Sequence, residues 1–234
     1  MSDSCEECNC CCQCNSEEED NGPVEEDLNS DNDVEIEIEI SSEEEPEQIV
    51  IVKNDPISDK FKPANPAERR LLNDLRAIMK SNSHDNGFSA EPDHDSLNIW
   101  NIKLFGFDKK DAIYEDIQKY KSLTGRDYVE LKAMFPPDYP VNPPFITVVR
   151  PRFIFHTGRV TVGGSICTDI LTQAGWKPTY NIEALLANVF AEILSSHPRI
   201  DLNNSTPYSL EEAKSAFMRV AADHGWKISN WLPK

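Results

Sequence analysis

Between residues 65 and 80, apolar side chains recur at the spacing of one face of a helix. The apolar positions of this face are Leu71, Leu72, Leu75, Ile78 and Met79. Just upstream, Asn65 is a favoured N-cap, Pro66 suits the first helical position and Glu68 can complete the cap. The pattern therefore predicts a helix that begins at Pro66 and ends near Lys80.

Farther along, four short segments are rich in β-branched and aromatic residues, and turn-forming residues bound each of them. These segments are Phe88–Pro92, Leu97–Phe105, Tyr128–Met134 and Phe145–Val149. Helical spacing returns at Lys109–Leu123, Ile182–Ser195 and about Leu210–His224. The order predicts an α+β fold: an N-terminal helix, a four-stranded antiparallel meander with an inserted helix between strands 2 and 3, and C-terminal helices that cover one face.

The acidic residues are concentrated in the first quarter of the chain. Residues 1–60 contain 21 Asp and Glu against 2 Lys, whereas residues 61–234 contain 20 acidic and 21 basic residues. Because residues 1–60 also hold a single leucine and no aromatic residue, they cannot bury enough apolar surface to offset the entropy of ordering. We expect a disordered, acidic, Cys-rich tail at 1–60 and one core domain at 61–234.

Composition also restricts the expected cellular compartment and the expected classes of binding partner. No segment has the pattern of a signal peptide or is apolar for long enough to span a membrane. The acidic tail argues against nucleic acid, which selects basic surfaces. Six of the seven cysteines lie between Cys5 and Cys14, which is not a disulfide framework for the domain. We expect a cytoplasmic or nuclear location, and neither a membrane nor nucleic acid as partner.

Two features of the tail have competing interpretations. The Cys5–Cys14 cluster is foremost an unstructured biased tract, with metal binding and acylation as weaker alternatives, because no second ligand pair follows its Cys-x-x-Cys spacing. A β-branched run flanked by acids comprises Ile49, Val50, Ile51 and Val52. This run resembles the SUMO-interacting motif, which adds a strand to a partner's sheet. The alternatives are a strand-forming segment without a partner, or one that pairs within the domain.

The domain has one cysteine, Cys167, in the string Gly-Gly-Ser-Ile-Cys-Thr-Asp-Ile-Leu at residues 163–171. A cysteine just after two glycines can lie with its sulfur exposed and the backbone close by, which suits a thiolate nucleophile. An isolated cysteine would more often be a buried apolar residue. The flanking pattern favours catalysis instead, because the whole string resembles the active-site segment of ubiquitin-conjugating (E2) enzymes.

The resemblance extends from Ala64 to about Trp226. The first helix, the loop Phe-Pro-Pro-Asp-Tyr-Pro-Val-Asn-Pro-Pro at residues 135–144 and the cysteine string match the family in order. The prolines make that loop stiff and extended. The inserted helix, the Gly-Gly before Ser-Ile-Cys and the Gln-Ala-Gly-Trp after it are similar to the Q-type subgroup. The resemblance implies a UBC-like fold with Cys167 as the catalytic residue.

The implied activity is an acyl transfer. The family accepts ubiquitin or a ubiquitin-like modifier from an E1 as a thioester on the cysteine, and passes it to an E3 ligase or a substrate. The resemblance implies that the chain needs no metal and no cofactor of its own, because ATP is consumed by the upstream E1. The competing hypothesis is a catalytically inactive variant that binds ubiquitin or ligases. Retention of Cys167 within an intact string weighs against that hypothesis.

The loop before the cysteine departs from the family. Most members carry His-Pro-Asn there, and the asparagine stabilises the oxyanion. Here His156 begins His-Thr-Gly, so the resemblance gives His156 the role of supporting the loop. Arg159 stands at the spacing of the missing asparagine, either as an electrostatic substitute or, as we favour, a solvated cation. Asp169 is expected to fix the loop by accepting backbone donors. The missing asparagine predicts slow transfer to lysine and favours cysteine or hydroxyl acceptors.

Other positions match the surface by which the family binds E1 and RING-type ligases. They are Arg69, Arg70, Val141, Lys177, Pro178 and Thr179. Family members usually carry a larger apolar residue where Val141 stands, which predicts weak affinity for RING ligases.

Two remaining groups have a structural interpretation. Asp201, Asn203 and Asn204 stand where the family places a gate over the cysteine, but a capped surface turn is favoured. Trp176 and Trp226 are expected to belong to the core rather than to a ligand site.

Overall fold

The computed structural model describes residues 57, 60–81, 84–94, 96–228 and 232–233. The Cys5–Cys14 cluster, the Ile49–Val52 motif and nearly all of the predicted tail lie outside the described residues.

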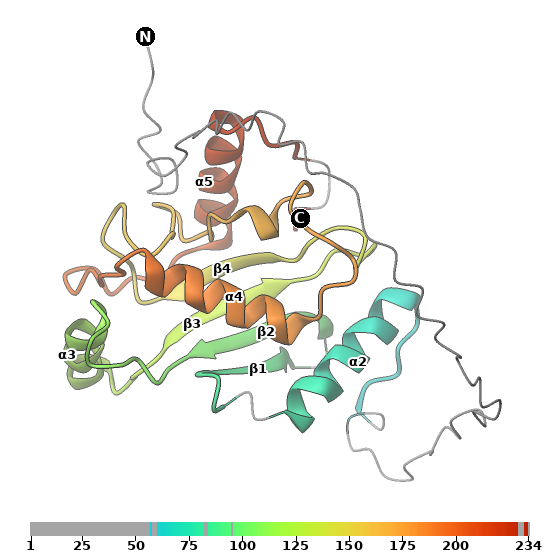
Figure 1. Cartoon of the computed structure of the whole chain (residues 1–234), viewed down its shortest axis with the longest axis horizontal. Coiled ribbons are helices and arrows are strands. Elements are labelled where there is room, and N and C mark those ends of the chain that lie inside the picture. Colours follow the sequence, from blue (N-terminus) through green and yellow to red (C-terminus); the bar gives the residue numbers. More distant parts are fainter. Residues whose placement is uncertain (1–56, 58–59, 82–83, 95, 229–231, 234) are drawn as a thin grey trace, which may run out of the picture.

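A four-stranded antiparallel sheet with the order β1-β2-β3-β4 forms the centre of the domain (Figure 1). Its strands are β1 (Phe88–Asp93), β2 (Ser96–Leu104), β3 (Val129–Met134) and β4 (Phe145–Arg150). Trp100 of β2 lies opposite Ala133 of β3, and Leu131 lies opposite Val148 of β4. The predicted α+β meander is confirmed, and each strand end lies within one residue of its predicted position.

The first described helix is α2 (Pro66–Lys80), with the predicted bounds. The Asn65 side chain accepts a hydrogen bond from the Glu68 N–H at 2.9 Å. Leu71, Leu75 and the other predicted core positions are buried, but Met79, in the last turn, is 62% exposed. The apolar face is therefore correctly predicted apart from its last member.

The inserted helix α3 (Tyr114–Thr124) begins five residues later than predicted. A closed turn precedes it, in which the Asp111 N–H donates to the Asp108 carbonyl at 2.9 Å and the Asp108 N–H donates to Asp111 Oδ2 at 2.7 Å. These bonds satisfy backbone groups without helical turns. Gly125, with φ +76°, ends the helix in the left-handed conformation typical of a C-cap.

The two C-terminal helices, α4 (Ile182–Ser195) and α5 (Leu210–Asp223), pack on different faces of the sheet, so the expectation that they cover one face is wrong. In Figure 1, α4 crosses the sheet, α3 stands beyond one end, and α5 stands near β4 on the side away from β1. The α4 side chains join the main core, whereas Phe217 of α5 joins a second cluster with Met134 and Phe145. Adjacent strand residues point to opposite faces, so Met134 and Phe145 face away from Ala133 and the main core.

Among the described helices, none has the length and apolar character needed to cross a membrane.

Candidate active site

Cys167 follows a tight hairpin beside the edge strand β4. Val160 pairs with Ile166 across the hairpin, and the Thr161 N–H donates to the Ser165 carbonyl at 2.9 Å. The hydroxyls of Thr161 and Ser165 are buried and lie 2.7 Å apart. The Val148 N–H donates to the Gly164 carbonyl at 2.8 Å, which attaches the hairpin to the sheet. The cysteine is therefore placed by a rigid scaffold rather than by a free loop.

The Cys167 residue itself is buried, with 1% of its surface exposed, so the expectation of an exposed sulfur is wrong for this conformation. The two glycines before Cys167 do not expose its sulfur. They allow neighbouring segments to approach the backbone closely. A Cβ on Gly163 would overlap the Glu212 carbonyl in α5, and one on Gly164, whose φ is +93°, would meet the Tyr208 ring. The glycines are thus required by close packing.

The cysteine loop, defined here as residues 154–159, has an unusual backbone. His156, Gly158 and Arg159 adopt left-handed φ angles of +65°, +67° and +52°. His156 is half-buried, and its ring centroid lies 3.9 Å from that of Phe155. Non-glycine residues in this region carry backbone strain, which persists only where the surroundings hold the chain in place.

Thr157 provides contacts that sequence reasoning missed. Its hydroxyl donates to the Ile154 carbonyl at 2.7 Å and accepts from the Arg199 N–H at 3.2 Å. Thr157 therefore ties the cysteine loop to the segment that follows α4. The available signal was a threonine before a glycine in an irregular segment, where such hydroxyls often bond the backbone.

Arg159 contacts both Cys167 and α4. Its carbonyl accepts the Cys167 N–H at 2.8 Å. Its side chain is half-buried, and Nε lies 2.7 Å from Glu192 Oε2 of α4, an ion pair without the alignment of a hydrogen bond. The favoured interpretation of Arg159 as a solvated cation is therefore wrong.

Asp169 begins the short 3₁₀ helix η2 (Asp169–Leu171), which comprises the last three residues of the cysteine string. Its backbone carbonyl accepts from the Thr172 N–H at 2.9 Å and from the Thr172 hydroxyl at 2.8 Å. Its side chain is exposed, and no described residue donates a hydrogen bond to its carboxylate. Asp169 orders this turn through its backbone, not through its side chain as we expected.

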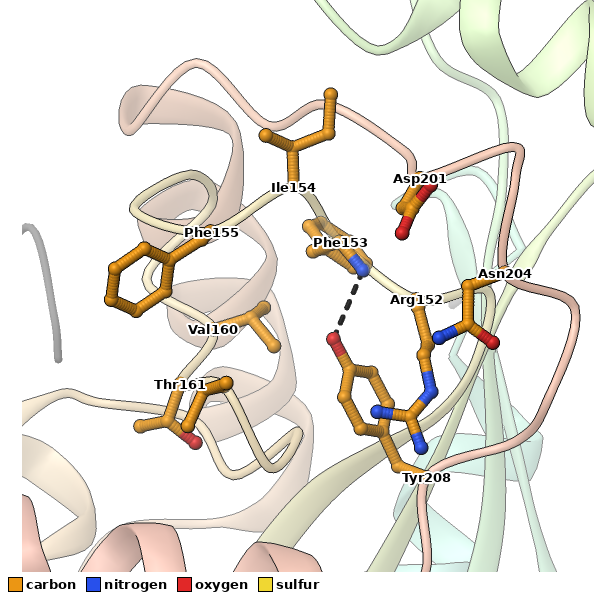
Figure 2. Close-up of a pocket in the computed structure, with 10 residues that line it drawn as sticks. Arg152, Phe153, Ile154, Phe155, Val160, Thr161, Asp201, Asn204 and Tyr208 are labelled. Carbon is orange, nitrogen blue, oxygen red and sulfur yellow. Dashed lines mark hydrogen bonds between the residues drawn. The ribbon is translucent and has the colours of Figure 1, made fainter.

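Asp201 and Asn204 belong to a surface turn, as favoured. Asp201 Oδ1 accepts from the Asn203 N–H at 3.0 Å, and Asn204 Oδ1 accepts from the Thr206 N–H at 3.1 Å. This turn forms one wall of a groove of about 410 Å³ (Figure 2). The groove is lined by Arg152, Phe153, Ile154, Phe155, Val160, Thr161, Val162, Asp201, Asn204 and Tyr208, and Cys167 is not among its lining residues.

Tyr208 anchors the base of this groove. Figure 2 shows its hydroxyl oxygen directed at the Phe153 N–H, which donates to it at 3.0 Å. Burial raises the pKa of the Tyr208 hydroxyl. The Arg152 guanidinium lies 4.3 Å from the Tyr208 ring centroid, and its Nη2 donates to both carboxylate oxygens of Glu212, at 2.9 and 3.0 Å. These contacts link the groove to the first turn of α5.

Arg70 connects two of the segments that carry the predicted E1- and ligase-binding surface. Its guanidinium donates to the Pro178 carbonyl at 3.0 Å and to the Tyr180 carbonyl at 2.6 Å. The proline loop joins the same region, because Trp176 Nε1 donates to the Pro140 carbonyl at 2.8 Å. Arg69, Lys177, Pro178 and Thr179 are exposed, and Val141 is 68% exposed.

Arg70 also has a structural role. Arg70 Nε and Asp74 Oδ2 form an ion pair at 3.0 Å, and the Tyr139 hydroxyl donates to the same oxygen at 3.0 Å. Burial raises the pKa of the Asp74 carboxyl, against the lowering effect of Arg70. Trp176 is buried, and half-buried Trp226 packs against the second cluster, as expected of core residues.

The chain matches the family model described as "Ubiquitin-conjugating enzyme" over residues 70–224. It is 34% identical over 165 residues to ubiquitin-conjugating enzyme E2 Q1 of Homo sapiens, covering 68% of this chain and 39% of that protein. It is 30% identical over 178 residues to ubiquitin-conjugating enzyme E2 25 of Caenorhabditis elegans, covering 73% of this chain and 45% of that protein.

In length, the chain spans less than half of each of these two relatives. Among solved structures, a ubiquitin conjugating enzyme E2 from Plasmodium falciparum matches with a TM-score of 0.45 and 20% identity. That match covers 60% of this chain and 92% of the other.

Proposed function

Because this chain belongs to the ubiquitin-conjugating enzyme family and resembles its Q-type members, we propose that it carries ubiquitin or a ubiquitin-like modifier as a thioester on Cys167. The Cys167 sulfur attacks the carbonyl of the modifier's thioester on an E1, a new S–C bond forms, and the E1 cysteine leaves with the proton. One thioester replaces another, so the reaction needs no further source of energy. The ATP is consumed earlier, by the E1, and we propose no cofactor or metal.

One observation carries this proposal. The family's cysteine string begins in a hairpin that is hydrogen-bonded to β4, and Cys167 directly follows that hairpin within the matched region. The scaffold holds the nucleophile in place, which removes much of the entropic cost of reaction. Since Cys167 is buried in this conformation, the sulfur becomes reachable only when neighbouring residues move. We propose that binding of the E1 or the modifier selects such an open form.

A charging assay tests the proposal. The full chain is incubated with E1, ATP and a panel of modifiers, and the products are separated without reductant. We expect an adduct that a thiol reagent removes, and that Cys167→Ala abolishes. Cys167→Ser should give an oxyester that resists the thiol reagent. An adduct that persists in Cys167→Ala would assign it to another residue, and no adduct with any modifier would favour the inactive adaptor.

The acceptor is the second part of the proposal. Loss of one oxyanion donor typically costs about a hundredfold or more in rate. Without the family's asparagine, we expect slow discharge to free lysine and faster discharge to a ligase cysteine or to a hydroxyl. The measurement is single-turnover discharge of the loaded protein to each acceptor. Fast discharge to lysine that is unaffected by changes at His156, Gly158 or Arg159 would contradict this account.

Arg159 provides a sharper test, because the structure shows it paired with Glu192. If its guanidinium acts on the oxyanion, it must leave that pair. Arg159→Ala should then slow discharge without slowing charging, whereas Glu192→Gln should leave discharge equal or faster. The opposite order of the two variants would exclude Arg159 as the donor.

We further propose E1 and E3 binding through the surface around Arg69, Val141 and Lys177, whose described side chains are exposed. The cysteine usage favours a reducing cytoplasmic or nuclear location for this reaction.

A further inference from the structure

Asp116 is a buried carboxylate of the inserted helix α3, and the proposed transfer does not use it. The residue is 3% exposed. Its carboxylate accepts hydrogen bonds from Arg199 Nε at 2.6 Å, Arg199 Nη2 at 3.2 Å and the Ile200 N–H at 3.0 Å. Burial would raise the pKa of Asp116, but the hydrogen bonds and the charge of Arg199 together hold it below its usual range. The charged carboxylate therefore holds the chain at residues 199–200.

That segment is joined directly to the cysteine loop. Phe153 pairs with Ile200 in an antiparallel bridge, and the Ile154 N–H donates to the Arg199 carbonyl at 2.8 Å. The Arg199 N–H also donates to the Thr157 hydroxyl at 3.2 Å. Arg199 thus holds the beginning and the middle of the cysteine loop, while its side chain is held by α3.

The cysteine loop requires such anchors. Three of its residues have left-handed backbones, two of them non-glycine, and this conformation is unfavourable for a chain free to relax. The last of these residues, Arg159, accepts the Cys167 N–H at 2.8 Å. A shift of the loop would therefore move the backbone carbonyl to which the Cys167 N–H donates. The side chain of Arg159 is held in turn by its ion pair with Glu192 of α4.

We propose that Asp116 is a positioning residue for Cys167: through Arg199 it fixes the cysteine loop, so that the inserted helix α3 sets how accessible the Cys167 thiol is. Its importance for catalysis rests on the proposed function, but its test does not. A partner that displaced α3 would change the reactivity of the thiol without touching it.

The test measures the alkylation of Cys167 by iodoacetamide in the full native chain, followed by mass spectrometry of the Cys167 peptide. Asp116→Asn preserves the shape of the side chain but removes its charge, and we expect the alkylation rate to rise by about tenfold as the loop opens more often. Thr157→Val cuts the connection nearer to the cysteine and should act similarly. Arg199→Lys, which keeps the charge but not the paired bonds, should give a smaller rise.

The matched control is Asp127→Asn. Asp127 lies just beyond the end of α3 and pairs at 2.9 Å with Lys121 of the last turn of that helix, and both side chains are exposed. We expect an alkylation rate within about twofold of the unchanged chain. An equal rise in this control would overturn the proposal, because it would show that any loosening of α3 has the same effect.

Hydrogen exchange separates local opening from global destabilisation. In Asp116→Asn, amides of residues 154–167 should exchange faster while those of β3 keep their rates. Equal acceleration in β3 would overturn the proposal, as would unchanged alkylation in both Asp116→Asn and Thr157→Val. If Asp116→Asn does not fold, Arg199→Lys tests the same contact from its other partner, and an unchanged alkylation rate in that variant would overturn the proposal. A chain that is never charged by an E1 would overturn the proposed function but not this coupling.

Discussion

Gly163 lies where the hairpin before Cys167 meets the first turn of α5. A Cβ at this position would overlap the Glu212 carbonyl and lie 2.8 Å from Ala216 Cβ. The φ of Gly163 lies outside the left-handed region, so the requirement for glycine is one of space alone. Gly125 is the reverse case, because its φ is +76° and nothing lies within 4 Å of an added Cβ.

This pair of glycines gives a prediction about stability. Gly163→Ala should lower the free energy of unfolding by about 2–3 kcal/mol, since backbone of α5 must move away. Gly125→Ala should cost about 1 kcal/mol, the penalty of a left-handed backbone alone. Urea unfolding of both variants gives the comparison. Equal losses, or a larger one at Gly125, would show that α5 does not rest closely on the hairpin.

At the scale of elements, the adjacent arginines Arg69 and Arg70 of α2 are expected to differ, with Arg70 structural and Arg69 available for the proposed partner binding. Arg70 joins α2 to residues 178–180 and pairs with the buried Asp74. Arg70→Ala should lower the free energy of unfolding by about 2 kcal/mol, because Asp74 loses a charged partner. Arg69 is exposed, so Arg69→Ala should change the free energy of unfolding by less than about 0.5 kcal/mol. The same substitution should slow charging by E1. The assays are urea unfolding and initial charging rates, and a similar stability loss in both variants would contradict the division.

Local signals located the elements well. They failed at one local turn that replaces the start of a helix, and where distant contacts decide the outcome. The cap at Asn65 predicted the start of α2 because a cap acts within four residues. The turn closed by Asp108 and Asp111 delayed the start of α3, since apolar spacing alone does not distinguish a turn from the first turn of a helix. The burial of Cys167 was missed, because burial depends on tertiary packing that a short sequence string does not determine. The close approach of Glu212 to Gly163 is another such long-range contact.

For the whole molecule, the main core runs from Phe61 onward, and Ile57 packs against it. The Phe61 N–H also donates to the Ile57 carbonyl at 2.8 Å. We therefore expect deletion of residues 1–56 to leave thermal stability and charging nearly unchanged. Deletion of residues 1–60 should cost about 1 kcal/mol, from loss of the partly buried Ile57. Calorimetry and charging assays of both truncations check this, and a large loss in the shorter deletion would place core contacts in the tail.

The tail also carries the proposed SUMO motif. If the β-branched run binds SUMO by adding a strand, alanine replacement of Ile49, Val50, Ile51 and Val52 should abolish a weak affinity measured by titration with SUMO. The same replacement should leave charging of Cys167 unchanged. Binding that survives it would assign the interaction to the domain.

The left-handed backbone at His156 and Arg159 has a consequence for protein engineering. A designer concerned only with thermostability would place glycine at both positions, since glycine adopts this conformation without a steric penalty. Natural proteins depart from such optima where activity requires it. Because the proposed transfer takes place beside this loop, both residues should be excluded from a stabilising redesign of this domain, and a library that varies them should be screened for turnover rather than for melting temperature.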